Sequence, residues 1–330
     1  MYFFLTACRN EELTMPEFLA EFARMLKGAG IANEARLYVV DDLSSDRTVA
    51  ILEQAQHLDL RVISAPTNLG NQGAMFYGLR QLQMLPGDTL ITFDSDGEDD
   101  VEQVPSIIAL AAKNPGTVVL IERGRRRESL LFKLFFGCYK LIFRFFTRQT
   151  TVPNNFLVIP GSLVPSIQNS PLASVHFAYA ILKLRPRYIS TTRDRRSRYG
   201  GRSSQNLFML VSHGLVGLMV FFEVVVAQIF MLLFLFGGFA VTVAALAIAL
   251  PADWVSVQRT LIWSAIMTAV GAVGLFSLLL SAALALVFKL AAFTLVPRAV
   301  SQSTTATHPT AGGCAQRSAV RDERLDREAS

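Results

Sequence analysis

The chain has 330 residues, of which 52% are hydrophobic, and its mean hydropathy of +0.38 is too high for an ordinary soluble enzyme. The hydrophobic excess lies in residues 204–296, which are almost uncharged, whereas residues 1–203 have the composition of a globular domain. The formal net charge is +5, and the three cysteines show neither a disulfide pattern nor zinc-ligand spacing. These features indicate a reduced, cytosol-facing domain attached to a membrane, and we expect no nucleic-acid partner.

Short apolar runs alternate with helical segments through the first part of the chain. The predicted strands are Tyr2–Ala7, Arg36–Val40, Leu60–Ser64 and Leu90–Phe93. The predicted helices span about Thr14–Lys27, about Arg47–His57 and a segment that ends near Leu85. Strands that alternate with helices indicate an α/β fold with a mainly parallel sheet. Ligands of such sheets bind at the carboxyl ends of the strands, so the residues after each strand are candidate site residues.

The predicted strand Leu90–Phe93 is followed by an acidic segment. It has five acidic residues within seven positions: Asp94, Asp96, Glu98, Asp99 and Asp100. These carboxylates repel each other unless a cation lies among them, and Mg²⁺ or Mn²⁺ takes oxygen ligands and shares its shell with substrate phosphates. A solvated acidic turn and a calcium-binding EF-hand loop are the alternatives. The EF-hand needs a Glu at its twelfth position, where this chain has Pro105, so we expect a metal–phosphate site.

Two more polar segments follow predicted strands. Arg9-Asn10-Glu11 comes after the first strand, and Asp41-Asp42 comes directly after the second. Because the carboxyl ends of parallel strands meet at one edge of a sheet, we expect both segments to share a cleft with Asp94–Asp100.

Four segments of the chain occur in an order that resembles family 2 glycosyltransferases. They are Cys8–Glu12, Val39–Asp46, Asn68–Ala74 and Asp94–Asp99. The resemblance covers roughly residues 1–215 and is greatest with the dolichol-phosphate mannosyltransferase-like branch, which includes bacterial polyprenyl-phosphate sugar transferases. It implies a GT-A-type domain that transfers a sugar from a nucleotide sugar, with inversion at the anomeric carbon.

The resemblance also implies roles for the strand-end residues. The residues at nucleotide-binding positions are Glu11, Asp41 and Asp42, of which Asp42 would accept a hydrogen bond from the base. Asp94 and Asp96 would hold the Mg²⁺ or Mn²⁺ ion that bridges the donor diphosphate. Glu98 stands where related enzymes often carry Gln, and it would be an anionic third ligand.

Several basic and polar residues are candidates for binding phosphate or acceptor. Arg123 and Arg127 follow the next predicted strand and would neutralise the leaving diphosphate, with a solvated basic turn as the alternative. Arg198 and Arg202 lie in a segment similar to the family's Arg-x-x-Gly-x-Ser, which implies contact with a phosphate; a positive-inside membrane flank is the competing interpretation. Asn155 is a candidate for contact with the sugar or acceptor, and an Asn turn is equally open.

The distribution of acidic residues bears on the acceptor. A hydroxyl acceptor needs a general base, usually a carboxylate, but residues 129–193 contain no Asp or Glu. An acceptor that is already a phosphate needs no base, so this interval favours a polyprenyl phosphate. Glu98, Asp99 and Asp100 remain candidate bases, which leaves a glycolipid or polysaccharide hydroxyl as the alternative.

Residues 130–148 are predicted to form an amphipathic helix. Lys133, Lys140, Arg144 and Arg148 fall on one stripe, and Leu, Phe and Ile fill the other face. This pattern is typical of a helix that lies in the membrane interface, and a helix packed on the sheet is the alternative.

The apolar part of the chain predicts two membrane spans. We expect an amphipathic approach at residues 204–228, spans at 229–250 and 260–288, and a disordered tail at 299–330. Basic clusters before the first span and after the second predict that the catalytic domain and both termini are cytoplasmic, in a plasma or inner membrane. We expect Glu223, in so apolar a setting, to pair with a neighbour or to line the acceptor path.

Together these features predict a membrane-bound inverting glycosyltransferase that uses a nucleotide-sugar donor, a polyprenyl-phosphate acceptor and a divalent metal. The alternatives are transfer to a lipid or polysaccharide hydroxyl, and a non-catalytic membrane scaffold with a degenerate transferase domain. Membrane lipids are expected partners, and a second copy of the chain or a flippase are candidate ones.

Overall fold

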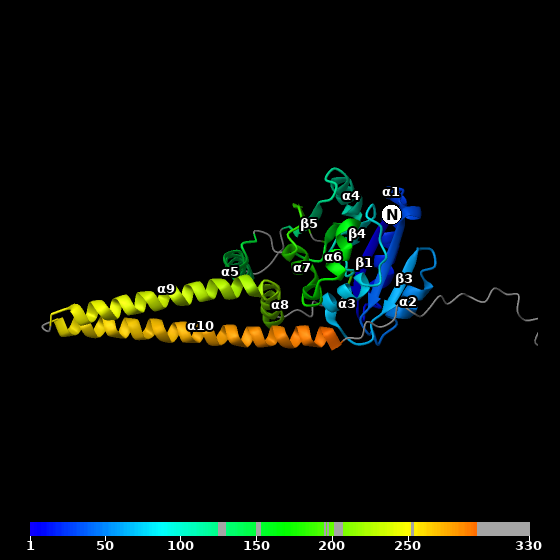
Figure 1. The fold of residues 1–330 in the computed structure, drawn as a ribbon. Coiled ribbons are helices and arrows are strands. Elements are labelled where there is room, and N and C mark those ends of the chain that lie inside the picture. Colours follow the sequence, from blue (N-terminus) through cyan, green and yellow to red (C-terminus); the bar gives the residue numbers. More distant parts are fainter. Residues whose placement is uncertain are drawn as a thin grey trace, which may run out of the picture. The chain divides into compact units, whose positions relative to one another are not determined.

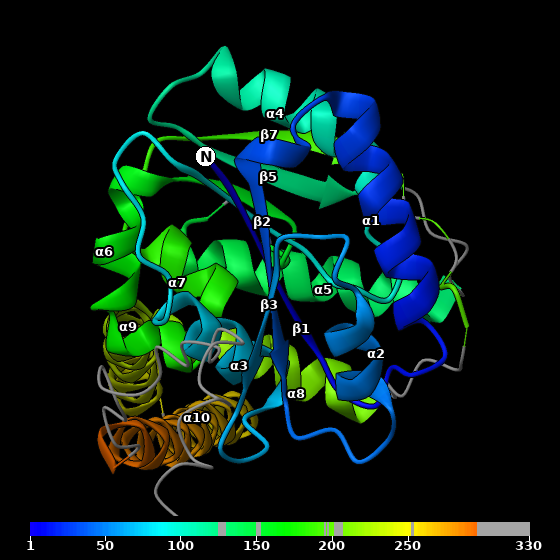
Figure 2. The same ribbon diagram turned by 90° about the vertical axis from the view of Figure 1, so that its right-hand side faces the viewer.

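The computed structural model describes residues 1–124, 130–149, 153–194, 196, 198–200, 207–251 and 254–295. In these residues seven strands form one sheet with the order β3-β2-β1-β4-β6-β5-β7 (Figures 1 and 2). The strands are β1 (Tyr2–Cys8), β2 (Ala35–Asp41), β3 (Leu60–Ser64), β4 (Thr89–Thr92), β5 (Val118–Arg123), β6 (Leu157–Pro160) and β7 (Tyr188–Arg193). The predicted α/β fold with a mainly parallel sheet is confirmed.

Strand directions decide which residues meet at one edge of the sheet. Strands β2, β1 and β4 are neighbours and parallel, so the residues that follow them lie side by side. Strand β6 is antiparallel to both β4 and β5, with Leu157 opposite Thr92. The residues that precede β6 therefore reach the same edge as those that follow β4. Strands β5 and β7 are parallel and end together at Arg123 and Arg193.

Helices cover both faces of the sheet because its central strands bury apolar side chains on both sides. The helices of the domain are α1 (Met15–Ala29), α2 (Thr48–Gln54), α3 (Gly70–Leu79), α4 (Val104–Ala112), α6 (Val164–Gln168) and α7 (Phe177–Lys183). In β1, Phe4 packs against Phe22 of α1, with ring centroids 5.0 Å apart. The next residue, Leu5, belongs to the core on the other face, together with Met75 of α3. The alternation of side chains along one strand thus feeds two separate cores.

Helix α5 (Leu130–Thr147) has an apolar anchor and an apolar exposed side. Phe143 is buried, and its ring lies 5.3 Å from that of Tyr179 on α7 and 5.8 Å from that of Phe221. Leu141 and Phe145 are exposed to 70% and 53%. Helix α5 therefore packs on the domain and still offers apolar side chains outward, and its insertion into a membrane interface stays a prediction.

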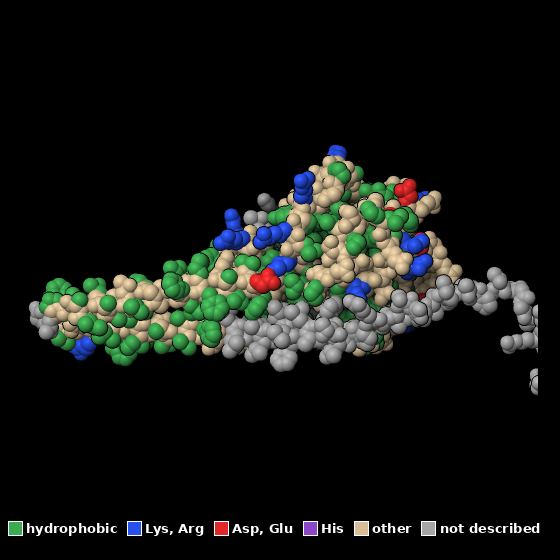
Figure 3. All heavy atoms as spheres, in the orientation of Figure 1, with side chains coloured by type: hydrophobic (Ala, Val, Ile, Leu, Met, Phe, Trp, Pro, Cys, Tyr) green, Lys and Arg blue, Asp and Glu red, His purple; other side chains and the backbone are tan. Residues whose placement is uncertain are grey.

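The apolar part of the chain forms α8 (Leu207–Val220), α9 (Phe222–Ala249) and α10 (Val255–Leu295). Within the described residues, two helical segments are long and apolar enough to cross a membrane: Phe222–Ala249 and Val255–Leu278. Helix α9 begins seven residues before the predicted first span, so Glu223 and Gln228 lie in its first two turns. Figure 3 shows hydrophobic side chains along α9. The predicted tail at residues 299–330 lies outside the described residues.

Candidate active site

The nucleotide-binding candidates lie where β1 and β2 end. Asp41 and Asp42 are both 4% exposed. An Asp41 oxygen accepts a hydrogen bond from the Ser44 amide at 3.2 Å, and Asp42 Oδ1 accepts one from the Leu69 amide at 2.6 Å. Leu43 between these loops has a left-handed φ of 63°, a conformation that costs a non-glycine residue about 1–2 kcal/mol. The Asp pair is therefore held rigidly at the sheet edge.

Glu11 follows β1 and is held at the start of α1. Its amide donates to Thr48 Oγ1 at 2.8 Å, and its carboxylate accepts from Thr14 Oγ1. Burial, and then the negative charges of Asp41 and Glu11, raise the pKa of the Cys8 thiol. Cys8 is thus a neutral, unreactive thiol under a strongly acidic surface.

Asp94 is oriented by a chain of amide side chains. Its Oδ1 accepts from Asn155 Nδ2 at 2.9 Å and from Asn71 Nδ2 at 3.3 Å. Gln72 Nε2 in turn donates to Asn155 Oδ1 at 2.9 Å, and the Phe177 amide donates to Gln72 Oε1 at 3.0 Å. This chain ties Asp94 to α3 and α7. The structure places Asn155 beside Asp94, and its predicted contact with sugar or acceptor stays a prediction.

Asn71 and Gln72 were not among the predicted site residues. Both belong to Asn68–Ala74, one of the four segments that resemble family 2 glycosyltransferases. That resemblance was the signal in the sequence that could have identified them. The contact of Gln72 with Asn155 depends on β6 running antiparallel beside β4, and that pairing has no local signature in the sequence.

Asp96 pairs with Arg198. The Arg198 guanidinium binds Asp96 Oδ2 directly, and its Nε lies 3.6 Å from Glu98 Oε1. Burial, and next the charge of Asp94, raise the pKa of Asp96, while Arg198 and the Glu98 amide act in the opposite direction. Burial lowers the pKa of Arg198, but the charge and hydrogen bond of Asp96 and the charges of Glu98 and Glu11 together outweigh burial, so the net shift is upward. Arg198, a predicted phosphate-binding residue, therefore contacts the acidic loop, residues 94–100.

Three residues that the sequence analysis missed hold Arg198 in place, and we call them the clasp: Glu21, Arg196 and Tyr199. Glu21 lies on α1 and is 4% exposed, and the hydroxyl of Tyr199 donates to its carboxylate. Arg196 Nη1 lies 3.0 and 3.1 Å from the two oxygens of Glu21. The sequence offered one signal for Glu21: it is an acidic residue on the apolar face of a predicted helix, three residues after Phe18.

The backbone of Arg196 and Tyr199 also packs on the acidic loop. The Tyr199 amide donates to the Asp96 carbonyl at 3.2 Å, and the Arg196 amide donates to the Glu98 carbonyl at 3.3 Å. Gly97 has a φ of 87°, and a Cβ there would lie 2.6 Å from the ring of Tyr199. Only glycine suits both the backbone conformation and this close approach.

Asp94 and Asp96 fit a divalent metal, but the predicted set of three carboxylates is not assembled. In the part of the chain that the structure describes, no three His, Cys, Asp or Glu side chains gather as metal ligands. Glu98 is directed toward Arg198, which explains why it does not join Asp94 and Asp96. Mg²⁺ and similar ions are commonly bound by one or two carboxylates together with substrate phosphates, so a pair of ligands suffices. Burial and then the negative charge of Asp94 raise the pKa of Asp96, and a bound cation offsets that negative charge.

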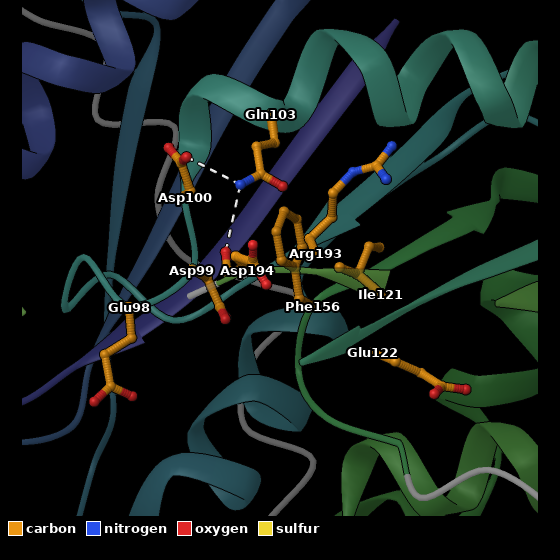
Figure 4. A pocket seen from close by; sticks show the side chains of 9 residues that line it. All are labelled: Glu98, Asp99, Asp100, Gln103, Ile121, Glu122, Phe156, Arg193 and Asp194. Carbon is orange, nitrogen blue, oxygen red and sulfur yellow. Dashed lines mark hydrogen bonds between the residues drawn. The ribbon is translucent and has the colours of Figure 1, made fainter. Parts of the chain in front are cut away.

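A small cavity lies behind the acidic loop (Figure 4). Its volume of about 10 Å³ has room for about one water molecule and not for a sugar nucleotide. Beside it, Gln103 Nε2 donates to Asp100 Oδ2 at 3.0 Å, and Asp99 Oδ2 accepts from the Asp94 amide at 3.0 Å. Asp99 and Asp100 thus stabilise the loop that presents Asp94 and Asp96.

The remaining predicted cations are only partly located. Arg123 ends β5 at the same sheet edge as the acidic loop, and its side chain lies outside the described residues. Arg127 and Arg202 also lie outside them. Their roles stay predictions.

Comparison with known proteins agrees with the motifs. Residues 4–163 match the family described as glycosyl transferase family 2. The undecaprenyl-phosphate 4-deoxy-4-formamido-L-arabinose transferase of Proteus mirabilis is 31% identical over 127 residues, which are 38% of this chain and 37% of that protein. The protein of the same name from Pseudomonas paraeruginosa is 32% identical over 123 residues, 36% of this chain and 34% of its own. The chain thus spans just over a third of the length of these relatives.

The solved structures that match the chain are more distant in sequence, and their TM-scores are below 0.5. A mannosyltransferase from Pyrobaculum calidifontis, in complex with GDP-Man and Mn²⁺, has a TM-score of 0.44 and 14% identity and covers 87% of each chain. Glucosyl-3-phosphoglycerate synthase from Mycobacterium tuberculosis has a TM-score of 0.43 and 15% identity, covering 68% of this chain and 78% of its own.

Proposed function

We propose that this chain, whose residues 4–163 match glycosyl transferase family 2, transfers a sugar from a nucleotide sugar to a polyprenyl phosphate at a membrane. The observation that carries the proposal is the meeting of Asp42, Asp94 and Asp96 at the carboxyl edge of β2, β1 and β4. Ligands of parallel sheets bind at this edge.

The donor would bind across these strand ends. Glu11, Asp41 and Asp42 would contact the nucleoside, and Asp94 and Asp96 would hold Mg²⁺ or Mn²⁺. The metal, when bound, neutralises the charge that grows on the leaving diphosphate. Arg198, now paired with Asp96, and Arg123 and Arg127 would add positive charge there.

The acceptor would be a phosphate because the chain offers few free bases. No Asp or Glu occurs in residues 129–193. Asp99 accepts from the Asp94 amide, and Asp100 lies 3.5 Å from Arg196. In the proposed reaction a phosphate oxygen of the acceptor bonds to the anomeric carbon while the bond from that carbon to the donor diphosphate breaks. No proton is transferred, so no base is needed.

The apolar helices would anchor the enzyme in a plasma or inner membrane. Helix α9 and the first part of α10 would be its spans, and α5 would lie in the interface. The domain and both termini would face the cytoplasm, where nucleotide sugars are available. Arg202 would meet the acceptor phosphate close to the lipid surface.

The test is to incubate the full chain in membranes with a panel of labelled nucleotide sugars and polyprenyl phosphate, and to separate the lipid products by thin-layer chromatography. A labelled lipid that forms only with the phosphate acceptor supports the proposal. Label in a glycolipid or polysaccharide instead would favour the hydroxyl-acceptor alternative. If the chain catalyses no sugar transfer and no nucleotide-sugar hydrolysis, the result would favour a non-catalytic scaffold.

A further inference from the structure

A large cavity lies apart from the strand ends, where α5, the end of α7 and the first turns of α9 meet. Its volume is about 630 Å³, within the usual range for ligand sites of about 300–1,000 Å³. The residues that line it are Thr147, Arg148, Gln149, Arg185, Glu223, Val224, Ala227, Gln228 and Met231. It therefore combines two arginines with an apolar wall from a helix long enough to span a membrane.

The walls of this cavity are anchored to the domain. Phe143 of α5, five residues before Arg148, packs against Tyr179 and Phe221. Lys183 Nζ lies 2.8 Å from Glu223 Oε2 and 5.9 Å from the centre of the Phe221 ring. This ion pair confirms the prediction that Glu223 pairs with a neighbouring residue, and it neutralises the charge of Glu223. The net charge at the cavity therefore comes from Arg148 and Arg185.

Both arginines have left-handed backbones. Arg148 has a φ of 58° and Arg185 a φ of 51°, and each follows the end of a helix, where glycine is the usual residue. They are two of the four non-glycine residues with positive φ in the described part of the chain. Strained backbone conformations of this kind cluster at active sites and ligand-binding sites.

The charge of these arginines is only partly balanced. Neither has a carboxylate partner among the described residues. Each adjacent helix end carries roughly half a negative charge, so two arginines exceed two helix ends by about one positive charge. That surplus matches the single negative charge of a phosphodiester. Gln228 Oε1, also in the cavity lining, is buried and has no hydrogen-bond partner in the described structure.

We infer that this cavity binds an anionic membrane phospholipid that is not the sugar acceptor. The lipid phosphate contacts Arg148 and Arg185, a headgroup hydroxyl donates to Gln228, and the chains follow the apolar side chains Val224, Ala227 and Met231. Figure 3 shows basic side chains gathered above the first part of α9. Basic pockets beside membrane helices recognise lipid headgroups in this way. The bound lipid would fix the junction between the domain and its first apolar helix.

The experiment titrates the full chain in detergent with phosphatidylglycerol, phosphatidylcholine or inorganic phosphate, and detects bound lipid by native mass spectrometry. We expect phosphatidylglycerol to bind selectively, and inorganic phosphate to compete poorly because it lacks the apolar chains. Arg148→Gln and Arg185→Gln should each weaken binding roughly tenfold. Arg144→Gln removes the same charge from an exposed position on the same helix and should change little.

Two further variants separate a binding role from a structural one. Arg148→Gly and Arg185→Gly remove the charge and relieve the left-handed backbone, so each should keep or raise the unfolding temperature while lipid binding weakens as much as in the glutamine variants. Equal weakening by Arg144→Gln, or a binding affinity unchanged in the glycine variants, would overturn the inference. Displacement of phosphatidylglycerol by equimolar polyprenyl phosphate would assign the cavity to the acceptor and also overturn it. These assays need no sugar transfer, so they stand apart from the test of the proposed function.

Discussion

Arg196 and Glu21 lie 175 residues apart in the chain, yet Nη1 of the arginine is 3.0 and 3.1 Å from the two carboxylate oxygens of the glutamate. Glu21 is buried in the domain, whereas the side chain of Arg196 is 40% exposed. Because Arg198 follows two residues later, this pair fixes the segment that brings a guanidinium to Asp96. The clasp thus links helix α1 to the acidic loop.

Removing the carboxylate of the clasp should loosen this segment. Glu21→Gln should lower the free energy of unfolding by about 1.5–3 kcal/mol, the usual contribution of hydrogen bonds to charged groups. It should also weaken binding of the nucleoside diphosphate, because Arg198 is no longer held at the site. Unfolding in denaturant and calorimetric titration measure the two effects. Glu17→Gln, on the exposed side of the same helix, is the matched control. Unchanged stability and affinity in Glu21→Gln would show that the clasp has no such role.

The metal site predicts a sharp loss of activity. Asp96→Asn removes a ligand charge at the end of a strand without removing a core contact, so transfer should be abolished while the protein stays folded. Chelation by EDTA should do the same to the native protein. Transfer assays with circular dichroism as the folding control measure both, and Asp59→Asn is a control outside the site. Full activity in EDTA would rule out a catalytic metal.

The raised pKa of Asp96 predicts how metal binding depends on pH. A protonated carboxyl is a poor ligand, so Mn²⁺ affinity should fall on acidification at a pH above the ordinary Asp value of 3.8. The pKa of Asp96 is higher in the folded protein than in the unfolded chain. At a pH below the unfolded-state pKa, protonated Asp96 therefore stabilises the folded, metal-free protein. This stabilisation is lost as the pH rises through the folded-state pKa.

Arg198→Gln supplies the matched variant for this prediction. Arg198 lowers the pKa of Asp96, so its removal should move the midpoint of Mn²⁺ binding to a still higher pH. Metal titrations over a pH series, followed by the paramagnetic signal of free Mn²⁺, measure the midpoint. A midpoint that does not move, or that moves to lower pH, would contradict the assigned pairing.

The nature of the acceptor predicts the effect of two loop acids. If the nucleophile is a phosphate, Asp99→Asn with Asp100→Asn should lose little activity, because asparagine keeps an accepting oxygen for the loop hydrogen bonds. If it is a hydroxyl and one of these acids is the base, the loss should be on the order of 10²–10⁴. Steady-state rates with saturating donor decide between them.

The pH profile gives a second measure of the acceptor. For a phosphate nucleophile the rate should rise along a single limb near the second phosphate pKa of roughly 6 and then reach a plateau. Arg202→Gln should weaken acceptor binding and make the remaining activity less sensitive to salt. Two results together would show that the acceptor is a hydroxyl. The Asp99→Asn, Asp100→Asn double variant would lose nearly all activity while it keeps its metal affinity, and Arg202→Gln would leave acceptor binding unchanged.

The sequence by itself determined the parallel strands β1 to β4 and the edge at which the site lies. Apolar runs such as Tyr2–Ala7 were located correctly to within one residue, because a buried strand needs a continuous apolar stretch between turns. The acids that follow β1, β2 and β4 meet because parallel strands of an α/β sheet end on one side. These features follow from local pattern and chain direction alone.

The tertiary structure decided which side chains complete the site. Asn155 reaches Asp94 only because β6 enters the sheet antiparallel between β4 and β5. Arg198 reaches Asp96 because Glu21, far away in the sequence, binds Arg196 of the same segment. Such contacts join residues far apart in the chain, and their energy depends on burial and mutual geometry, which no local pattern of residues encodes.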